Sequence, residues 1–417
     1  MKIAQIAPAW IAVPPKNYGG TENVIYNLVE ELVTLGHDVT LFTPGDARTS
    51  ARQISFFPTS LIAEGVPWSA YLKAHYHLYS AIDSVKQEHF DVVHTHLSSS
   101  ADMCLFPLTA SLATPHVTTL HSHFPFDGVP GGWIGDADPL YLARWASSTP
   151  LVAISQSARA QAPREADFAG VVHHGVRMQD YRPQGNGEGE YFAWLGRFVP
   201  DKGAHLAIES ARQAGVPLML AGQVQHHHES QHYFHEVIQP QIDGTQVQYV
   251  GPVDLKQKVK LLSRARGLLN PITWEEPFGM VMIEAMAIGC PIISFARGAA
   301  PEIIVHGKTG FLVNDVEEMV RYIPRIAEID RDTTRRHIEL KFSARSMAEN
   351  YVHVYRKVIQ QSKARHASPN APVRKPAIIL GSTPVKPSVP MSIQHQEADP
   401  AKRVARANPS SKSAALE

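Results

Sequence analysis

Short apolar segments alternate with helix-length amphipathic segments from the start of this chain, and this alternation constrains the fold more than any other feature. Residues 3–7 predict a buried strand, and residues 22–35 place their apolar side chains at helical spacing. Gly36 ends that helix, and residues 39–42 predict the next strand. A strand, a helix and a strand in this order predict a parallel sheet with helices on both faces.

The alternation breaks once and then restarts, which predicts two domains of this kind. Further strands of the first domain are predicted at residues 92–94, 116–120 and 151–154, and another strand at residues 173–176 follows the domain. The polar, glycine-rich stretch 182–189 then predicts an exposed linker. Asp254 is the predicted N-cap of a helix in the second domain. The strands of that domain are predicted at residues 191–195, 218–221, 247–250, 267–270 and 291–295.

The predicted domain organisation follows from these breaks. Residues 1–170 form a first Rossmann-like domain, residues 171–190 a linker and residues 191–341 a second Rossmann-like domain. Residues 342–362 have one apolar face and predict a closing helix that belongs with the first domain. Residues 363–417 contain few large apolar residues and predict a disordered tail. The fold class is therefore α/β, with two doubly wound domains facing a cleft where ligands of open sheets bind.

Composition excludes several classes of protein. Apolar residues make up 44% of the chain, as in soluble globular proteins, and 39 basic side chains balance 39 acidic ones. This balance disfavours nucleic acid as a partner. No apolar run is long enough for a membrane span or a signal peptide, so we expect a cytoplasmic protein with Cys104 and Cys290 as buried free thiols.

Two glutamates mark the most informative stretch for function. Glu276 and Glu284 are eight residues apart, on either side of an apolar segment that predicts a helix. If the helix begins at Pro277, the two residues are separated by roughly 12 Å along its axis. That span matches the distance from the ribose to the sugar ring of a nucleoside diphosphate sugar. A carboxylate among apolar neighbours, as at Glu284, also needs a partner.

Two cations follow the first strand of the second domain. Arg197 and Lys202 lie between the strand at residues 191–195 and the next helix. A guanidinium fork and an ammonium group on such a turn suit a diphosphate. Taken alone, the two could also be solvated loop charges, but together with the acidic pair they favour a nucleotide-linked substrate.

The segment from Glu276 to Pro291 resembles the Glu-x7-Glu signature of retaining glycosyltransferases of family 4, which have the GT-B fold. Residues 195–203, Leu-Gly-Arg-Phe-Val-Pro-Asp-Lys-Gly, look like the diphosphate loop of that family, and residues 19–22, Gly-Gly-Thr-Glu, look like its N-terminal glycine loop. The resemblance covers nearly all of residues 1–362. It implies transfer of a hexosyl group from a nucleoside diphosphate sugar to a hydroxyl of a glycan, a glycolipid or a small molecule.

The resemblance also implies roles for individual residues. Arg197 and Lys202 hold the diphosphate, Glu284 the ribose and Glu276 the transferred sugar. His121 matches a histidine thought to contact that sugar. The remaining implied donor-binding residues are Gly19, Gly20, Phe278, Gly279 and Met280. Gly19 and Gly20 let the backbone approach a phosphate, and amides at the start of the helix at residue 22 add partial positive charge.

The implied enzyme needs no metal and no cofactor besides its donor, although several other interpretations stay open. A nucleotide-sugar epimerase and a non-catalytic sugar-nucleotide-binding protein are the alternatives. Contact with the inner face of a membrane, the oligomeric state, the donor base, the sugar and the acceptor are not readable from the motifs. Asp136 and Asp138 mimic a metal pair in a glycine-rich loop, and the histidines at 226–228, 232 and 235 predict a surface cluster.

Two positions depart from the family pattern. His174 stands where the family often has Asn, and Ala299 stands where a second glycine is frequent. We expect His174 to change contacts between the domains and Ala299 to shift the backbone near the donor sugar. His94 and His96 are expected to shape the site or to pair structurally.

Overall fold

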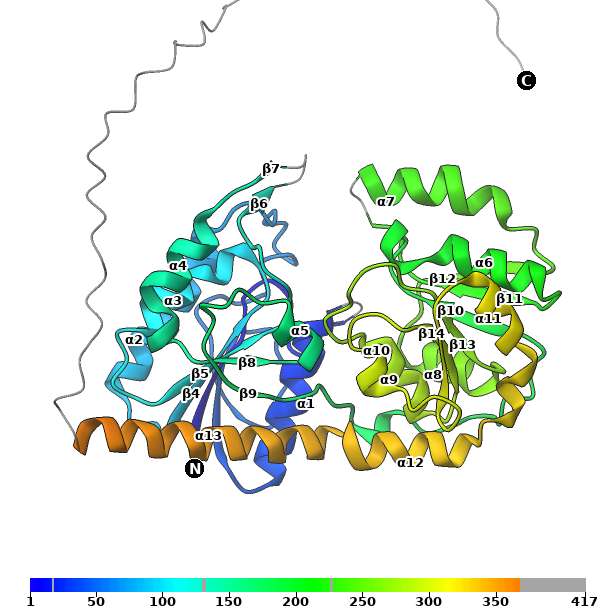
Figure 1. Cartoon of the computed structure of the whole chain (residues 1–417). Helices are drawn as coiled ribbons and strands as arrows, with labels where there is room; N and C mark the ends of the chain where they lie inside the picture. The colour runs from blue at the N-terminus through cyan, green and yellow to red at the C-terminus, as the bar shows by residue number, and fades with distance from the viewer. Residues whose placement is uncertain (17–18, 130–132, 226–227, 368–417) are drawn as a thin grey trace, which may run out of the picture. The chain divides into compact units, whose positions relative to one another are not determined.

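The first sheet of the protein is parallel and has seven strands. The structure is a computed structural model that describes residues 1–16, 19–129, 133–225 and 228–367 (Figure 1). Within it the strand order of the first sheet is β3-β2-β1-β4-β5-β8-β9. The strands are β1 (Lys2–Ile6), β2 (Asp38–Phe42), β3 (Arg52–Ile54), β4 (Val92–Leu97), β5 (His116–Leu120), β8 (Leu151–Ala153) and β9 (Phe168–Val171).

Helices cover both faces of this sheet because its strands carry apolar side chains on both faces. Helices α1 (Gly20–Thr34) and α13 (Ala344–Ala367) pack on one face, around Ile3, Val92 and Val117. Helices α2 (Leu72–Gln87) and α3 (Leu105–Thr109) pack on the other, around Ala4 and Val93. The remaining elements of this half are α4 (Ala137–Trp145), α5 (Gln156–Ala160) and the antiparallel pair β6 (Gly128–Val129) and β7 (Trp133–Ile134).

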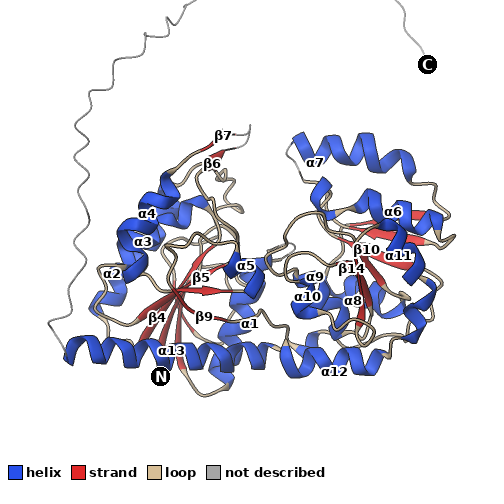
Figure 2. Ribbon diagram, in the orientation of Figure 1, coloured by secondary structure: helices blue, strands red, loops and turns tan. Residues whose placement is uncertain are grey.

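The second sheet is also parallel and has six strands in the order β12-β11-β10-β13-β14-β15 (Figure 2). Alternate residues of β10 face opposite layers: Phe192 and Trp194 pack with one helical layer and Ala193 with the other. The strands are β10 (Phe192–Leu195), β11 (Leu218–Ala221), β12 (Val247–Gly251), β13 (Leu268–Asn270), β14 (Ile292–Phe295) and β15 (Gly310–Val313). The helices are α6 (Ala204–Gln213), α7 (His228–His232), α8 (Leu255–Arg264), α9 (Met280–Ala287), α10 (Ala300–Ile303), α11 (Val316–Tyr322) and α12 (Arg331–Lys341).

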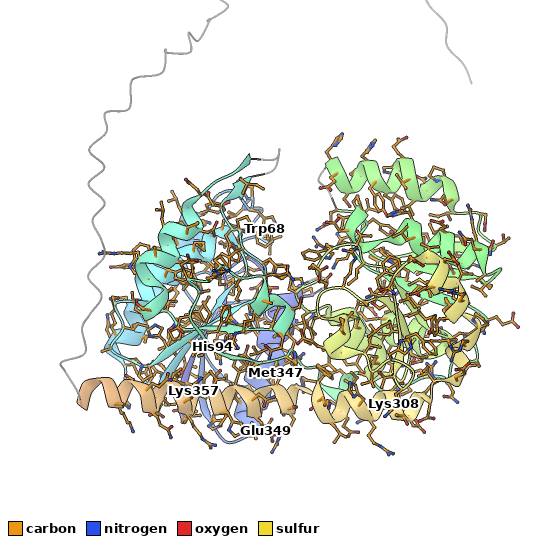
Figure 3. All side chains as sticks on the ribbon, in the orientation of Figure 1. Trp68, His94, Lys308, Met347, Glu349 and Lys357 are labelled. Atoms are coloured by element: carbon orange, nitrogen blue, oxygen red, sulfur yellow. The ribbon has the colours of Figure 1, made fainter. Side chains whose placement is uncertain are left out.

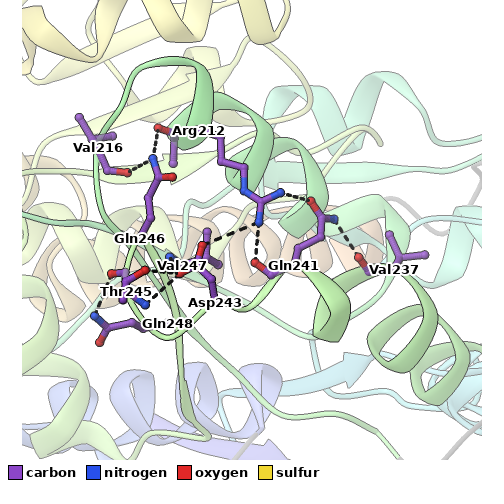
Figure 4. A network of polar contacts seen from close by, with 10 residues as sticks. Arg212, Val216, Val237, Gln241, Asp243, Thr245, Gln246, Val247 and Gln248 are labelled. Carbon is purple, nitrogen blue, oxygen red and sulfur yellow. Dashed lines mark hydrogen bonds and ion pairs between the residues drawn. The ribbon is translucent and has the colours of Figure 1, made fainter.

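Local sequence determines several of the element ends. Asp254 caps α8 as predicted: its carboxylate accepts from the Gln257 amide at 2.8 Å, and the Gln257 side chain returns a hydrogen bond. Near the edge strand β12, Asp243 accepts from the amides of Thr245 and Val247, which lowers its pKa to about 2 (Figure 4). Arg212 of α6 donates to the Gln241 carbonyl at 2.8 Å in the same network. Backbone amides that a short loop leaves free are thus paired.

The predicted fold class is confirmed, but the segment after β9 differs from the prediction. No strand forms at residues 173–176, where a single bridge joins Val176 to Ser343. The stretch 182–189 is exposed or half-buried as predicted, whereas the residues before it are packed, since His174 and Tyr181 are buried. The aromatic and apolar side chains of this segment pack against Phe278 and Phe342, so they cannot be solvated.

Helix α13 starts two residues later than the predicted closing helix and continues to Ala367, five residues beyond its predicted end. Residues 363–367, predicted as the start of the tail, are therefore helical. The rest of the predicted tail, residues 368–417, lies outside the described residues. Helix α13 packs on α1, β5 and β9, so the last helix of the described residues covers part of one face of the first sheet.

Candidate functional site

Three side chains of the second half form the centre of the candidate site. Lys202 ends a short 3-10 helix after β10, and Glu276 lies in the loop after β13, the neighbouring strand. The ammonium group of Lys202 forms an ion pair with Glu276, and both side chains are largely buried. Trp274 Nε1 donates to the same carboxylate at 2.9 Å, and its ring centroid lies 5.2 Å from Lys202 Nζ. The carboxyl ends of two adjacent strands thus bring together a cation and a carboxylate that the sequence separates by 74 residues.

The backbone around Glu276 is fixed by a glycine. Gly298 has a φ of +56°, and a Cβ at this position would lie 2.3 Å from the Glu276 carbonyl oxygen. The next amide, from Ala299, donates to that carbonyl oxygen at 3.0 Å. Ala299 itself has φ of −81°, a conformation that any residue adopts, which explains why a second glycine is not required here.

Arg197 reaches the same end of β10 but has a weaker set of contacts. Its Nη1 lies 3.5 Å from Gln225 Oε1. Its Nε is buried, with no hydrogen-bond partner among the described residues. A buried guanidinium N–H without an acceptor is costly, so this atom is suited to an oxygen of a ligand.

Glu284 has different partners from those of Glu276. It is 6% exposed, and its two oxygens are already paired: Tyr181 donates its hydroxyl proton to Oε1 at 2.9 Å, and Lys258 Nζ donates to Oε2 at 2.8 Å. The expected partner of this buried carboxylate therefore exists as two groups from other parts of the chain. A ribose contact at Glu284 stays a prediction, and it would use the lone pairs that these two donors leave.

The helix between the two glutamates is shorter than expected. Helix α9 begins at Met280, after Gly279 in the left-handed conformation (φ of +84°), so the assumption that Pro277 starts the helix was wrong. Glu276 lies in a loop, where Pro277 and Gly279 interrupt helical geometry. The roughly 12 Å separation, calculated along a continuous helix, therefore does not apply. The ring of Phe278 is buried against His174 and Phe342, which leaves only its backbone for a ligand.

In the first half, Gly19 and Gly20 precede and begin helix α1. A Cβ at Gly19 would lie 2.8 Å from Pro15 Cβ and 2.9 Å from Glu22 Oε2, so packing within the chain already requires this glycine. A Cβ at Gly20 would meet no atom within 4 Å. Glu22 is 5% exposed, and burial, with a smaller contribution from the Asp102 charge, raises its pKa to about 7.

His121 follows β5 and lies among other histidines. Its Nε2 is 2.9 Å from His96 Nδ1, and its ring stacks on that of His174 at 5.2 Å. Burial lowers the pKa of His121 to about 3, so the imidazole is neutral at pH 7. The ring of His174 also lies 5.0 Å from that of Phe278, and its effect on contacts between the two halves stays a prediction.

Loops of the second half contact the first half through side chains that the sequence did not single out. His123 Nε2 lies 2.7 Å from the Glu275 carbonyl oxygen, and Ser155 donates to the Pro277 carbonyl oxygen at 2.7 Å. Glu302 accepts from the amides of residues 156 and 157 and pairs with His173 at 2.8 Å. Burial alone would raise the Glu302 pKa, but these donors lower it. Trp274, which contacts Glu276 and Lys202, was not singled out either. Its position two residues before Glu276 could have indicated that it belongs to the site.

The other predicted signals have structural explanations. Asp138 accepts from the amides of Phe126 and Asp127 and so braces the loop that was compared with a metal pair. Among the described residues no group of three or more His, Cys, Asp or Glu side chains could hold a metal ion. Cys104 and Cys290 are free, but Cys104 is only half-buried. No helix in the described ranges is long and apolar enough to cross a membrane.

Two parallel α/β sheets, with charged residues at the carboxyl ends of their strands, define a protein of the GT-B class. The family comparisons agree with this class. The model for glycosyltransferase family 4 matches residues 18–180, and the model for glycosyl transferases group 1 matches residues 179–339. Together the two matches span both sheets, so each half of the chain matches a glycosyltransferase family.

Known proteins resemble the chain over most of its length. It is 25% identical over 397 residues to spore coat protein SA of Bacillus subtilis, covering 86% of this chain and all of that protein. Sucrose-phosphate synthase from Thermosynechococcus elongatus aligns with a TM-score of 0.70 and 17% identity, covering 87% of this chain and 100% of that one. Anabaena Alr3699/HepE, solved in complex with UDP and glucose, aligns with a TM-score of 0.61 and 17% identity, covering 85% and 98%. At these identities the two solved structures show the fold.

Proposed function

We propose that the protein is a retaining glycosyltransferase that moves a hexosyl group from a nucleoside diphosphate sugar to an acceptor hydroxyl. The observation that carries the proposal is the cluster of Lys202, Glu276 and Trp274 at the carboxyl ends of β10 and β13. Arg197, in the loop after β10, adds a buried Nε–H that has no partner among the described residues. Charged groups at this edge of an open sheet are placed where ligands of such sheets bind. The Anabaena relative in fold, solved with UDP and glucose, is consistent with such a donor.

The proposed donor site uses the Lys202–Glu276 pair as a switchable contact. A diphosphate carries more negative charge than the single carboxylate of Glu276, so it competes for the ammonium group of Lys202. Glu276, released from Lys202 but still held by Trp274, is then free to accept from a hydroxyl of the sugar. Arg197 supplies a second, planar donor to the phosphates.

The proposed chemistry needs no nucleophile from the protein. The glycosidic bond to the phosphate breaks while the acceptor oxygen attacks from the same face, and the leaving phosphate takes the acceptor proton. Lys202 and Arg197 stabilise the charge that develops on that phosphate. Metal-independent transfer and a cytoplasmic location, with or without contact at the inner membrane face, are part of the same proposal.

Donor binding and turnover test the proposal together. Thermal shift across UDP, GDP and ADP sugars should identify one donor that stabilises the protein. Incubation of that labelled donor with candidate acceptors should give a product whose anomeric configuration, read by NMR, is that of the donor. Inverted product would refute the retaining route. Epimerisation without an acceptor, or binding with neither transfer nor hydrolysis, would support the two alternatives instead.

A further inference from the structure

A continuous chain of buried polar side chains connects helix α13 with His121. Gln5, on β1, is its central member: Nε2 donates to the Tyr355 hydroxyl at 3.0 Å, and Oε1 lies 3.1 Å from His96 Nε2. His96 Nδ1 then lies 2.9 Å from His121 Nε2. On the other side of Tyr355, the hydroxyl is 2.7 Å from His94 Nδ1. Figure 3 shows His94 on the first sheet, beside helix α13.

The chain continues from His94 to a second tyrosine of α13, and its members are neutral. His94 Nε2 lies 2.6 Å from Thr119 Oγ1, which lies 2.8 Å from the Tyr351 hydroxyl. Burial lowers the pKa values of His94 and His96 well below the usual range, as it does for His121. Each imidazole therefore carries one proton at pH 7, and each ring has one donor nitrogen and one acceptor nitrogen.

The positions of the protons in this series of hydrogen bonds determine which nitrogen of His121 is the donor. The carbonyl oxygen of Gln5 can only accept, so His96 Nε2 carries the proton of its ring. His96 Nδ1 is then the acceptor, and His121 Nε2 must donate to it. His121 Nδ1 is left with a lone pair, and this atom is buried without a partner among the described residues.

We propose that Gln5 and Tyr355 are positioning residues that hold His121 as the tautomer with its proton on Nε2. The Tyr355 hydroxyl accepts from the Gln5 amide and donates its own proton to His94 Nδ1, whereas an amide rotated by 180° would need this hydroxyl to donate to Gln5 and His94 Nδ1 to carry the proton. A rotated amide would donate to His96 Nε2, which would reverse every bond up to His121 and place a proton on Nδ1. The direction of one amide thus decides whether Nδ1 is a donor or an acceptor.

The consequence for ligand recognition rests on the proposed function. With its lone pair on Nδ1, His121 accepts a hydrogen bond from a sugar hydroxyl. The residue that sets this preference, Tyr355, lies 234 positions further along the chain than His121.

NMR of the full chain labelled with 15N-histidine tests the proposal without a substrate. Long-range proton–nitrogen correlations at pH 7 show which ring nitrogen carries the proton, and the signals absent in His121→Gln identify His121. We expect one neutral tautomer of His121, protonated on Nε2. A proton on Nδ1, or an imidazolium ion, would overturn the proposal. Because no donor is present, failure of the proposed function would leave this result unchanged.

Two matched variants then separate positioning from packing. Tyr355→Phe keeps the ring but removes the hydroxyl that orients Gln5, so we expect both tautomers of His121 to be populated. Tyr351→Phe removes an equally buried hydroxyl one helical turn away, beyond His94, and should leave the single tautomer unchanged. If both variants, or neither, alter the His121 signals, Tyr355 does not position it. The wild-type spectrum decides the tautomer even if a variant fails to fold.

Discussion

The stability of the protein should fall as the pH rises because the buried Glu22 loses its proton. The side chain is 5% exposed at the start of α1, and burial raises its pKa from 4.5 to about 7. A carboxyl group with a raised pKa holds its proton more tightly in the folded state. Its contribution to stability is therefore fully present below pH 4.5 and is lost as the pH rises through about 7.

The magnitude follows from the size of the shift. A rise of about 2.5 pKa units, at 1.36 kcal/mol for each unit, corresponds to about 3 kcal/mol. Glu22→Gln has no proton to lose, so its free energy of unfolding should lack this decrease. Between pH 4.5 and pH 8.5 the variant should gain about 3 kcal/mol relative to the unmodified protein.

Urea unfolding at a series of pH values and constant ionic strength measures this difference. Tryptophan fluorescence and far-UV circular dichroism should be compared, because coincident curves are needed to treat the transition as one step. Glu31→Gln, on the same helix at a half-buried position, is the matched control for removal of a carboxylate from α1. A difference between Glu22→Gln and the unmodified protein that does not change with pH would refute the reasoning that burial holds this proton.

Four substitutions or deletions test other features of the structure. Arg197→Ala with Lys202→Ala should abolish binding of the nucleoside diphosphate in calorimetry, and near-normal affinity would exclude the phosphate role. Tyr181→Phe removes the hydroxyl that donates to Glu284 Oε1 and should lower the free energy of unfolding by about 1–3 kcal/mol, measured in urea. No decrease would show that water replaces the hydroxyl. Gly298→Ala forces a Cβ onto neighbouring backbone and should reduce transfer activity more than it changes the Tm. Deletion of residues 368–417 should leave the Tm unchanged, and a large decrease would show that these residues fold onto the rest.

Most strands of the fold could be predicted because they are buried on both faces and so form continuous apolar runs. The edge strand β3, Arg52–Ile54, was missed because only one of its three residues is apolar and none is buried. The start of α9 was misplaced because helical periodicity does not reveal that Gly279 adopts a left-handed conformation. The local sequence pattern predicts neither a short, exposed edge strand nor a glycine in the left-handed conformation.

The candidate site was predictable only where its residues lie within one motif. Glu276 and Lys202 were each singled out, but the ion pair between them joins two loops that only the sheet order brings together. Glu284 was expected to have a partner, yet nothing in its neighbourhood identifies Tyr181, 103 residues earlier. Such contacts depend on tertiary packing, which spacing along the sequence does not encode.

The position of helix α13 in the sequence has a consequence for how the protein folds during its synthesis. Its residues Met347, Tyr351 and Tyr355 share one core with Ile3 and Val24, at the opposite end of the described chain. While the ribosome still holds the last third of the protein, the first sheet has an uncovered apolar face. We therefore expect the first half to finish folding only once α13 has been synthesised, and to need protection from aggregation until then. A truncated gene that ends within residues 171–190 would encode a first half without α13, and the apolar face of its sheet would stay exposed. We therefore expect that the first half cannot be expressed as an independent domain.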